Sequence, residues 1–176
     1  IEATFRIERA RLVAGLVRLV RSIDRAEELA QDALVIALDA WPKSGVPANP
    51  GAWLMTAAKR RAIDAIRHDR MRLSKQAEIA HALDDAADDA TAAIEAALSD
   101  DLGDELLGLI FTACHPILSA EARAALTLRV VGGLSIDEIA RAFLSSEAAI
   151  AKRIVRAKQA ILSAGLTFEV PRGSAR

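Results

Sequence analysis

The chain has 176 residues and a net charge of −1 at pH 7, and 52% of its residues are hydrophobic while only 3% are aromatic. Its single cysteine excludes an internal disulfide framework. The lack of a signal peptide or an apolar run of about 18 residues predicts a cytoplasmic protein that does not span a membrane. Because the chain is rich in alanine and leucine and has no tyrosine, we predict an all-α fold.

Charge is distributed unevenly along the sequence. Residues 1–72 carry a net charge of +4, residues 73–105 carry −9 and residues 106–176 carry +4. This pattern predicts two small helical domains, at 1–72 and 106–170, joined by an acidic linker over 73–105 and followed by a tail over 171–176. Basic domains favour polyanionic partners.

The first domain opens with an apolar stripe that predicts an amphipathic helix. Asp24 is expected to cap the next helix, with Glu27 in the reciprocal capping position. One side of that second helix is expected to be buried, through alanines, Leu34, Leu38 and Trp41. The other side combines polar and acidic residues with one aliphatic residue: Glu28, Gln31, Asp32, Val35 and Asp39. The pattern alone fits either a binding surface or an ordinary solvated face.

A third helix is expected after a Gly- and Pro-containing loop at 43–48. Asn49 is a favoured N-cap residue, and Pro50 fits the first helical position. The second half of this helix is strongly basic, with Lys59, Arg60, Arg61, Arg67, Arg70 and Arg72. Some of this charge complements the helix dipole, but the excess predicts a surface that faces phosphates.

The second domain contains a pattern typical of a helix-turn-helix. Ser135 and Glu138 form a capping-box pair that starts a short helix, and Ser146 starts a longer one. The longer helix has an apolar stripe that includes Ile150 and Ile154, while its other faces carry Lys152, Arg153, Arg156 and Gln159. Such a helix can bury one side and place the other in the major groove of DNA. The alternative is an ordinary helical hairpin with a solvated basic face.

No catalytic site, metal site or cofactor is indicated by the sequence. One cysteine and three scattered histidines supply too few ligands for a closed zinc site, so Cys114 and His115 are interpreted as packing residues at a helix boundary. Pairs of carboxylates occur only in the acidic segment, without apolar surroundings to raise a pKa. The sequence therefore does not favour an enzyme.

Several of these segments together resemble the extracytoplasmic-function (ECF) group of bacterial sigma factors. The resemblance rests on the order and spacing of residues 26–33, 52–64, 134–140 and 151–157, and it spans nearly the whole chain. Residues 111–116 and 168–171 further resemble a branch of this group whose members carry a long C-terminal extension. That extension is absent from this chain, and either it or a separate regulatory partner is expected to control such a factor.

The resemblance implies two all-α domains like sigma domains 2 and 4, which bind core RNA polymerase and promoter DNA. The core-binding residues would be Glu28, Gln31, Asp32 and Val35. Single-stranded minus-ten DNA would be bound by Lys59, Arg60, Arg61, Arg67 and Arg70. Duplex minus-thirty-five DNA would be bound by Glu147, Ala148, Ala149, Lys152, Arg153 and Arg156.

Arg60 departs from the family pattern, because an asparagine usually stands there close to the captured base. The usual minus-ten preference therefore does not transfer directly. The turn at 143–146 lacks the family's usual glycine and is still expected to close. The acidic linker has two interpretations: a solvated spacer, or a mimic of nucleic acid that occupies a basic polymerase channel through Asp84, Asp85, Asp88 and Asp89.

Two other functions are compatible with the residues. As alternatives to a sigma factor, the chain could be a stand-alone helix-turn-helix regulator, with residues 1–72 as a sensing or dimerising module, or a helical adaptor that binds acidic proteins. The absence of a long apolar heptad pattern gives dimerisation little support.

Overall fold

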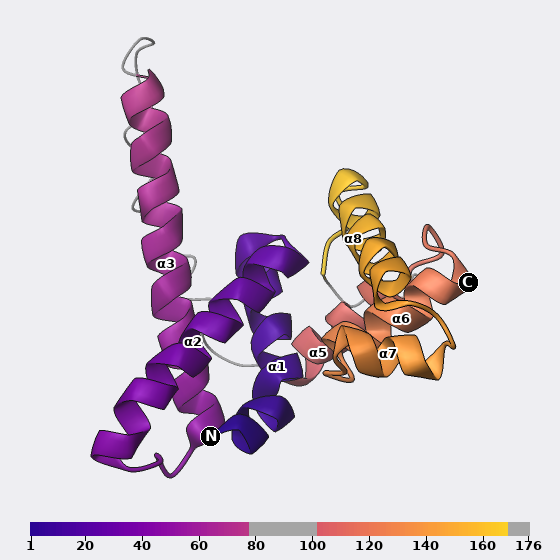
Figure 1. Ribbon diagram of the computed structural model, residues 1–176. Coiled ribbons are helices and arrows are strands. Elements are labelled where there is room, and N and C mark those ends of the chain that lie inside the picture. Colours follow the sequence, from indigo (N-terminus) through magenta and orange to yellow (C-terminus); the bar gives the residue numbers. More distant parts are fainter. Residues whose placement is uncertain (78–101, 169–176) are drawn as a thin grey trace, which may run out of the picture.

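The computed structural model describes residues 1–77 and 102–168 (Figure 1). Every regular element in these two ranges is a helix, which confirms the all-α prediction. The described helices are α1 (Glu2–Val20), α2 (Ile23–Ser44), α3 (Pro50–Ala77), α5 (Leu102–Ala113), α6 (Ala120–Val130), α7 (Ile136–Ala142) and α8 (Glu147–Ser163). Of the helices in the described ranges, none combines the length and apolarity that crossing a membrane requires.

Helices α1, α2 and α3 pack against one another and form the N-terminal module. Leu16 of α1, Ala30 of α2 and Ala58 of α3 are buried where the three helices meet. Trp41 of α2 and Trp53 of α3 meet edge to face, with ring centroids 5.4 Å apart. Because such aromatic pairs contribute beyond their buried area, this contact fixes α2 against α3.

The start of α2 differs from the prediction. Ser22, rather than Asp24, is the N-cap residue, and its side chain accepts a hydrogen bond from the backbone amide of Arg25. The sequence offers two residues that can cap a helix here, and the extended backbone of Ser22 decides between them. Asp24 and Glu27 instead form ion pairs with Lys158, a residue far along the chain.

Helix α3 begins as predicted, since the side chain of Asn49 accepts a hydrogen bond from the amide of Ala52 at 3.0 Å. The predicted loop at 43–48 is shorter than expected, because α2 continues to Ser44. Helix α3 continues to Ala77, and α5 begins at Leu102. Both ends of the predicted linker therefore lie in helices, while its centre, with the four aspartates of the proposed mimic, lies outside the described residues.

Helices α5 to α8 form the C-terminal module, in which α8 packs against both α6 and α7. The helix starts are capped as the sequence predicts. The hydroxyls of Ser119, Ser135 and Ser146 accept hydrogen bonds from backbone amides three residues later. The carboxylate of Glu138 accepts one in return from the amide of Ser135, which completes the capping box.

The turn between α7 and α8 closes through an unusual residue. Leu144 has a φ of 48° and is 96% exposed, so a branched side chain occupies left-handed backbone without any packing contact that favours it. The amide of Ser145 donates to the carbonyl of Ala140 at 2.9 Å, which satisfies the end of α7. The turn thus forms without glycine, at the cost of local strain.

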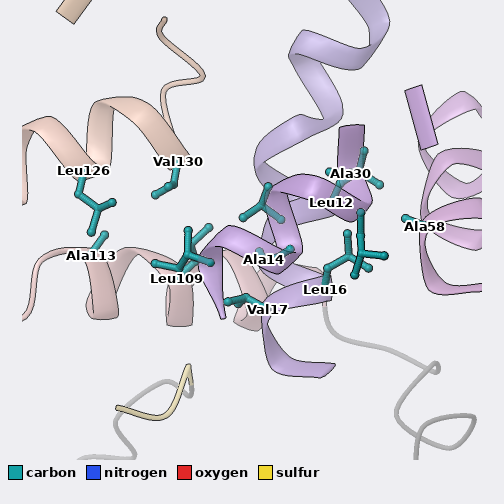
Figure 2. Packing of buried hydrophobic residues seen from close by; sticks show 14 of the residues in the cluster. Leu12, Ala14, Leu16, Val17, Ala30, Ala58, Leu109, Ala113, Leu126 and Val130 are labelled. Atoms are coloured by element: carbon teal, nitrogen blue, oxygen red, sulfur yellow. The ribbon is translucent and has the colours of Figure 1, made fainter. Parts of the chain in front are cut away.

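The two modules share one hydrophobic core. Helix α5 lies between them in Figure 1 and packs along α1. Figure 2 shows Ala14 and Val17 of α1 beside Leu109 of α5, and the buried residues continue to Leu126 and Val130 of α6. The sequence predicts two small domains but does not predict how they pack together.

Candidate nucleic-acid interface

The polar face of α2 is exposed along its length. Glu28, Gln31 and Val35 are exposed and Asp32 is half-buried, while the opposite side of the helix is buried through four alanines and Trp41. Val35 is 58% exposed. A single exposed aliphatic residue is common on protein surfaces, so Val35 alone does not distinguish a binding surface from a solvated face. The prediction that Leu38 lies on the buried side of α2 is wrong, because this residue is 45% exposed.

The basic residues of α3 lie in two environments. Arg60, Arg61 and Arg67 are exposed, whereas Lys59 is half-buried. Burial lowers the pKa of Lys59 from its ordinary value, and the negative charge of Glu105 acts in the opposite direction. Arg70 belongs to α3, but its side chain lies outside the described residues.

An ion pair links the α2 face to the α3 cations. The guanidinium of Arg61 lies 3.8 Å from the carboxylate of Asp32, and both side chains are about half exposed. Asp69, farther along α3, pairs with Arg25 of α2 at 2.7 Å. Exposed pairs of this kind contribute little to stability. Their effect here is to place the predicted core-binding face and the predicted single-strand surface side by side.

Helix α8 presents the predicted groove-facing residues as an amphipathic helix should. Glu147, Ala148, Ala149, Lys152 and Arg156 are exposed and Arg153 is half-buried. The other side of α8 is buried through four apolar residues: Ile150, Ile154, Ala157 and Ile161. The helix is thus held firmly by its apolar side, which leaves its cations available to a phosphate backbone or to base edges.

A cavity of about 450 Å³ lies between α8 and the start of α6. Lys152, Arg153 and Arg156 line one side, and Ser119 and Ala122 line the other. Glu121 is near this cavity. The pKa of its carboxyl group is lowered mainly by hydrogen bonds from its own backbone and Ser119, with a smaller contribution from the charge of Arg153. Arg153 thus lines the cavity between α6 and α8 and lies close enough to Glu121 for their charges to interact.

Four charged residues between the modules were not assigned a joint role by the sequence analysis. Arg9, Glu27, Arg129 and Lys158 come from four different helices and meet in one cluster. Lys158 and Glu27 are 131 positions apart in the sequence. No local pattern carries a signal for such a pair, because capping and helical periodicity relate only near neighbours.

Cys114 and His115 directly follow the end of α5, so they lie at a helix boundary as predicted, but Cys114 is exposed and the predicted packing role is wrong for it. The Cys114 sulfur lies 3.6 Å from the hydroxyl of Thr127, and the Nδ1 atom of His115 accepts a hydrogen bond from the amide of Ile117. Within residues 1–77 and 102–168, no three His, Cys, Asp or Glu residues gather in a metal-binding arrangement.

A basic helical bundle followed by a helix-turn-helix with an exposed cationic second helix defines a nucleic-acid-binding protein. Two family models match the chain in the order of its modules: Sigma-70 region 2 over residues 5–72, and Sigma-70, region 4 over residues 109–161. The chain belongs to the sigma-70 family of transcription initiation factors, which confirms the resemblance to sigma factors and the predicted fold class.

A curated relative extends beyond this chain. An uncharacterized protein of Rhizobium meliloti (strain 1021) is 40% identical over 169 residues, which cover 93% of this chain and 38% of the relative. The chain thus spans less than half the length of that relative. No solved structure matches the chain.

Proposed function

We propose that this protein is an ECF-type sigma factor, the promoter-specificity subunit of bacterial RNA polymerase. The observation that carries the proposal is the presence of two exposed cationic surfaces, on α3 and α8, in one chain that also presents an uncovered acidic-aliphatic face on α2. The order of the region 2 and region 4 matches supports this assignment. A regulator that reads duplex DNA alone needs only the surface on α8.

The α2 face binds core RNA polymerase in this proposal. Glu28, Gln31 and Asp32 supply polar and charged contacts, and Val35 supplies apolar area. Charged residues at the edge of an interface govern association more than affinity, whereas a covered apolar residue contributes directly to affinity. The loss of Val35 is therefore expected to weaken binding even when the charges are kept.

The α3 surface holds the unwound minus-ten strand. Lys59, Arg60, Arg61, Arg67 and Arg70 neutralise phosphates along that strand. Extruding a base from the stack costs a few kcal/mol, and capture of the extruded base by the protein offsets that cost. Strand opening on this surface requires binding energy and no bond chemistry by the sigma factor.

Helix α8 reads the minus-thirty-five duplex. Arg153 is the proposed base-reading anchor, because arginine pairs bidentately with guanine, and Lys152 and Arg156 contact phosphates or bases. Glu147, Ala148 and Ala149 occupy the first turn of α8, where recognition helices approach base edges.

The deciding experiment is co-purification of the chain with bacterial core RNA polymerase. The test variant replaces Gln31, Asp32 and Val35 by alanine. A matched control replaces three exposed residues of α1, Glu2, Ile7 and Arg11, by alanine. We expect saturable binding by the parent and the control, and loss of binding by the test variant.

Two results would contradict this assignment. If the folded parent does not bind core polymerase, the stand-alone regulator becomes the better account, and selection of duplex sites from random DNA is then the next measurement. If the test variant binds core polymerase as well as the parent does, the polymerase-binding surface does not depend on these three residues of α2.

A further inference from the structure

The cavity between α6 and α8 combines a cationic side with an apolar lining. Lys152, Arg153 and Arg156 of α8 supply its positive charge. Most of the remaining lining is apolar and includes Leu118 and Ala157, which are 6% and 3% exposed. The volume of about 450 Å³ lies within the range of roughly 300–1,000 Å³ that is typical of small-molecule sites. The cavity is therefore large enough for a small organic ligand.

The three cations of the cavity have no acidic partner in an ion pair. Elsewhere in the same module, Arg141 pairs with Asp137 at 3.1 Å. Among the ion pairs formed by residues 1–77 and 102–168, none involves Lys152, Arg153 or Arg156. Positive charges that gather around a cavity without counter-charges raise the local potential and favour the binding of an anion.

One carboxylate beside the cavity acts against the binding of an anion. Glu121 is exposed in the first turn of α6, and its charge interacts with that of Arg153. The hydrogen bonds of its carboxylate come mainly from its own backbone and from Ser119. One negative charge does not balance three positive charges, so the cavity keeps an excess of positive charge.

The charge and the lining together favour a nucleotide. A phosphate group carries a charge of about −1.5 to −2 at pH 7, so one phosphate does not neutralise three cations, whereas two adjacent phosphates do. An inorganic anion leaves the apolar lining uncovered. A base covers apolar surface and also stacks on the plane of an arginine guanidinium. A nucleoside diphosphate combines these properties.

We propose that the cavity between α6 and α8 binds a nucleoside diphosphate, which occupies the cations of α8 and thereby excludes the minus-thirty-five duplex. The cavity does not depend on the sigma assignment, but its effect on promoter binding rests on the proposed function. Duplex binding alone does not require this cavity, because a recognition helix projects its side chains into the major groove. Ile117, Ser119 and Ala122 line the cavity from outside α8.

The first arm of the test measures nucleotide binding to the whole chain without DNA. Isothermal titration calorimetry is carried out with GDP, guanosine and inorganic pyrophosphate. Ile117→Asp adds a carboxylate to the cavity at a residue that is 50% exposed, so the change is compatible with folding. Val155→Asp is the matched control, because Val155 is 51% exposed on α8 and lies outside the cavity lining.

We expect saturable binding of GDP at one site, and weaker binding of guanosine and of pyrophosphate. Ile117→Asp should weaken GDP binding about 10-fold, because the added carboxylate repels the phosphates, and Val155→Asp should change it little. Glu121→Gln should strengthen GDP binding by about 2- to 5-fold, because it removes an exposed negative charge. This gain of affinity cannot arise from a folding defect.

Three results of this arm would overturn the proposal. Absence of saturable GDP binding would exclude the site. Equal weakening by Ile117→Asp and Val155→Asp would mean that GDP associates with the basic surface in general and not with the cavity. Pyrophosphate that binds as tightly as GDP would exclude a contribution of the base.

The second arm measures competition with a duplex that the chain selects from random DNA. GDP at ten times its dissociation constant should weaken duplex binding by the parent about 10-fold. Pyrophosphate at the same ionic strength is the control, because salt alone weakens DNA binding. Equal effects of GDP and pyrophosphate would contradict exclusion of the duplex by the nucleotide. If the chain binds neither duplex nor core polymerase, the proposed function fails, while calorimetry still decides whether the cavity binds GDP.

Discussion

Leu144 shows how a single residue can store strain in the turn between α7 and α8. Its backbone is left-handed, which costs a non-glycine residue roughly 1–2 kcal/mol, and its side chain is almost wholly exposed. Leu144→Gly should therefore raise the free energy of unfolding by about 0.5–1 kcal/mol, after the greater freedom of glycine in the unfolded chain is included. Urea denaturation with an unchanged m-value checks this expectation.

A control for this change lies two residues earlier. Ala142 is exposed at the end of α7 in helical backbone, and Ala142→Gly should lower stability by up to about 1 kcal/mol. Opposite signs at the two positions would identify backbone conformation as the cause. A destabilising Leu144→Gly would show that the leucine side chain makes a contact in solution that offsets its strain.

Glu138 makes the start of α7 sensitive to acid. Hydrogen bonds from the backbone amide and the hydroxyl of Ser135 lower the pKa of its carboxyl group below the ordinary value. A lowered folded-state pKa means that this stabilisation is present above the ordinary pKa of a glutamate and is lost as the pH falls through the lowered pKa of the folded state. Glu138→Gln keeps an oxygen acceptor but removes the charge, so it should lower stability modestly at pH 7 and reduce the further loss of stability on acidification.

Thermal unfolding at pH 7 and pH 3.5 measures this difference. Glu2→Gln, at an exposed carboxylate outside the α7 capping box, provides the comparison. If the parent and Glu138→Gln lose the same amount between the two pH values, the capping carboxylate does not contribute to the acid sensitivity.

At the scale of the helices, α8 combines two kinds of cation. Arg153 is half-buried in the cavity wall next to α6, whereas Lys152 and Arg156 are exposed. In the proposed function the half-buried Arg153 reads a base, and the exposed cations contact phosphates or bases. Arg153→Ala should weaken binding to a minus-thirty-five duplex by roughly 1–3 kcal/mol and relax the preference at one base pair.

Binding to a set of duplexes that differ at single positions tests this assignment. Arg141→Ala, which removes an exposed α7 arginine from a local pair with Asp137, controls for the loss of one positive charge. A uniform loss across all duplexes with Arg153→Ala would mark Arg153 as a phosphate contact instead.

The helices were predictable where neighbouring residues determine them. Asn49, Ser119, Ser135 and Ser146 cap backbone amides three residues later, and such bonds are visible as sequence patterns. The start of α2 was not predictable in this way. Ser22 and Asp24 are both of residue types that can cap a helix, and Asp24 instead forms an ion pair with Lys158, which only folding brings near it.

The same distinction applies to the candidate interface. Amphipathic spacing placed Glu28, Gln31, Lys152 and Arg156 on exposed faces, and the structure leaves them exposed. Spacing within one helix did not reveal that Lys59 is partly covered or that the charge of Glu105, a residue of α5, acts on it, because both depend on how the helices pack.

For the molecule as a whole, the shared hydrophobic core predicts that the two modules unfold together in one cooperative transition. Both tryptophans of the chain, Trp41 and Trp53, lie in the N-terminal module, so their fluorescence reports that module alone. Far-ultraviolet circular dichroism reports the helices of both modules. Because buried residues run without interruption from α3 through α1 and α5 to α6, the two signals should give coincident urea transitions.

Gly15→Leu tests whether the α1–α5 contact causes this coupling. A Cβ atom at residue 15 would lie 2.8 Å from the end of the Met55 side chain of α3 and 3.0 Å from the Glu105 carboxylate of α5, so the larger leucine side chain crowds the space between α1, α3 and α5. Overpacking of this kind costs about 1–3 kcal/mol. The fluorescence and dichroism transitions should then separate, whereas Ala3→Leu, at an exposed position of the same helix, should leave them coincident. Coincident transitions in Gly15→Leu would mean that charge contacts such as those of Glu27 with Arg9 and Lys158 are sufficient to couple the modules.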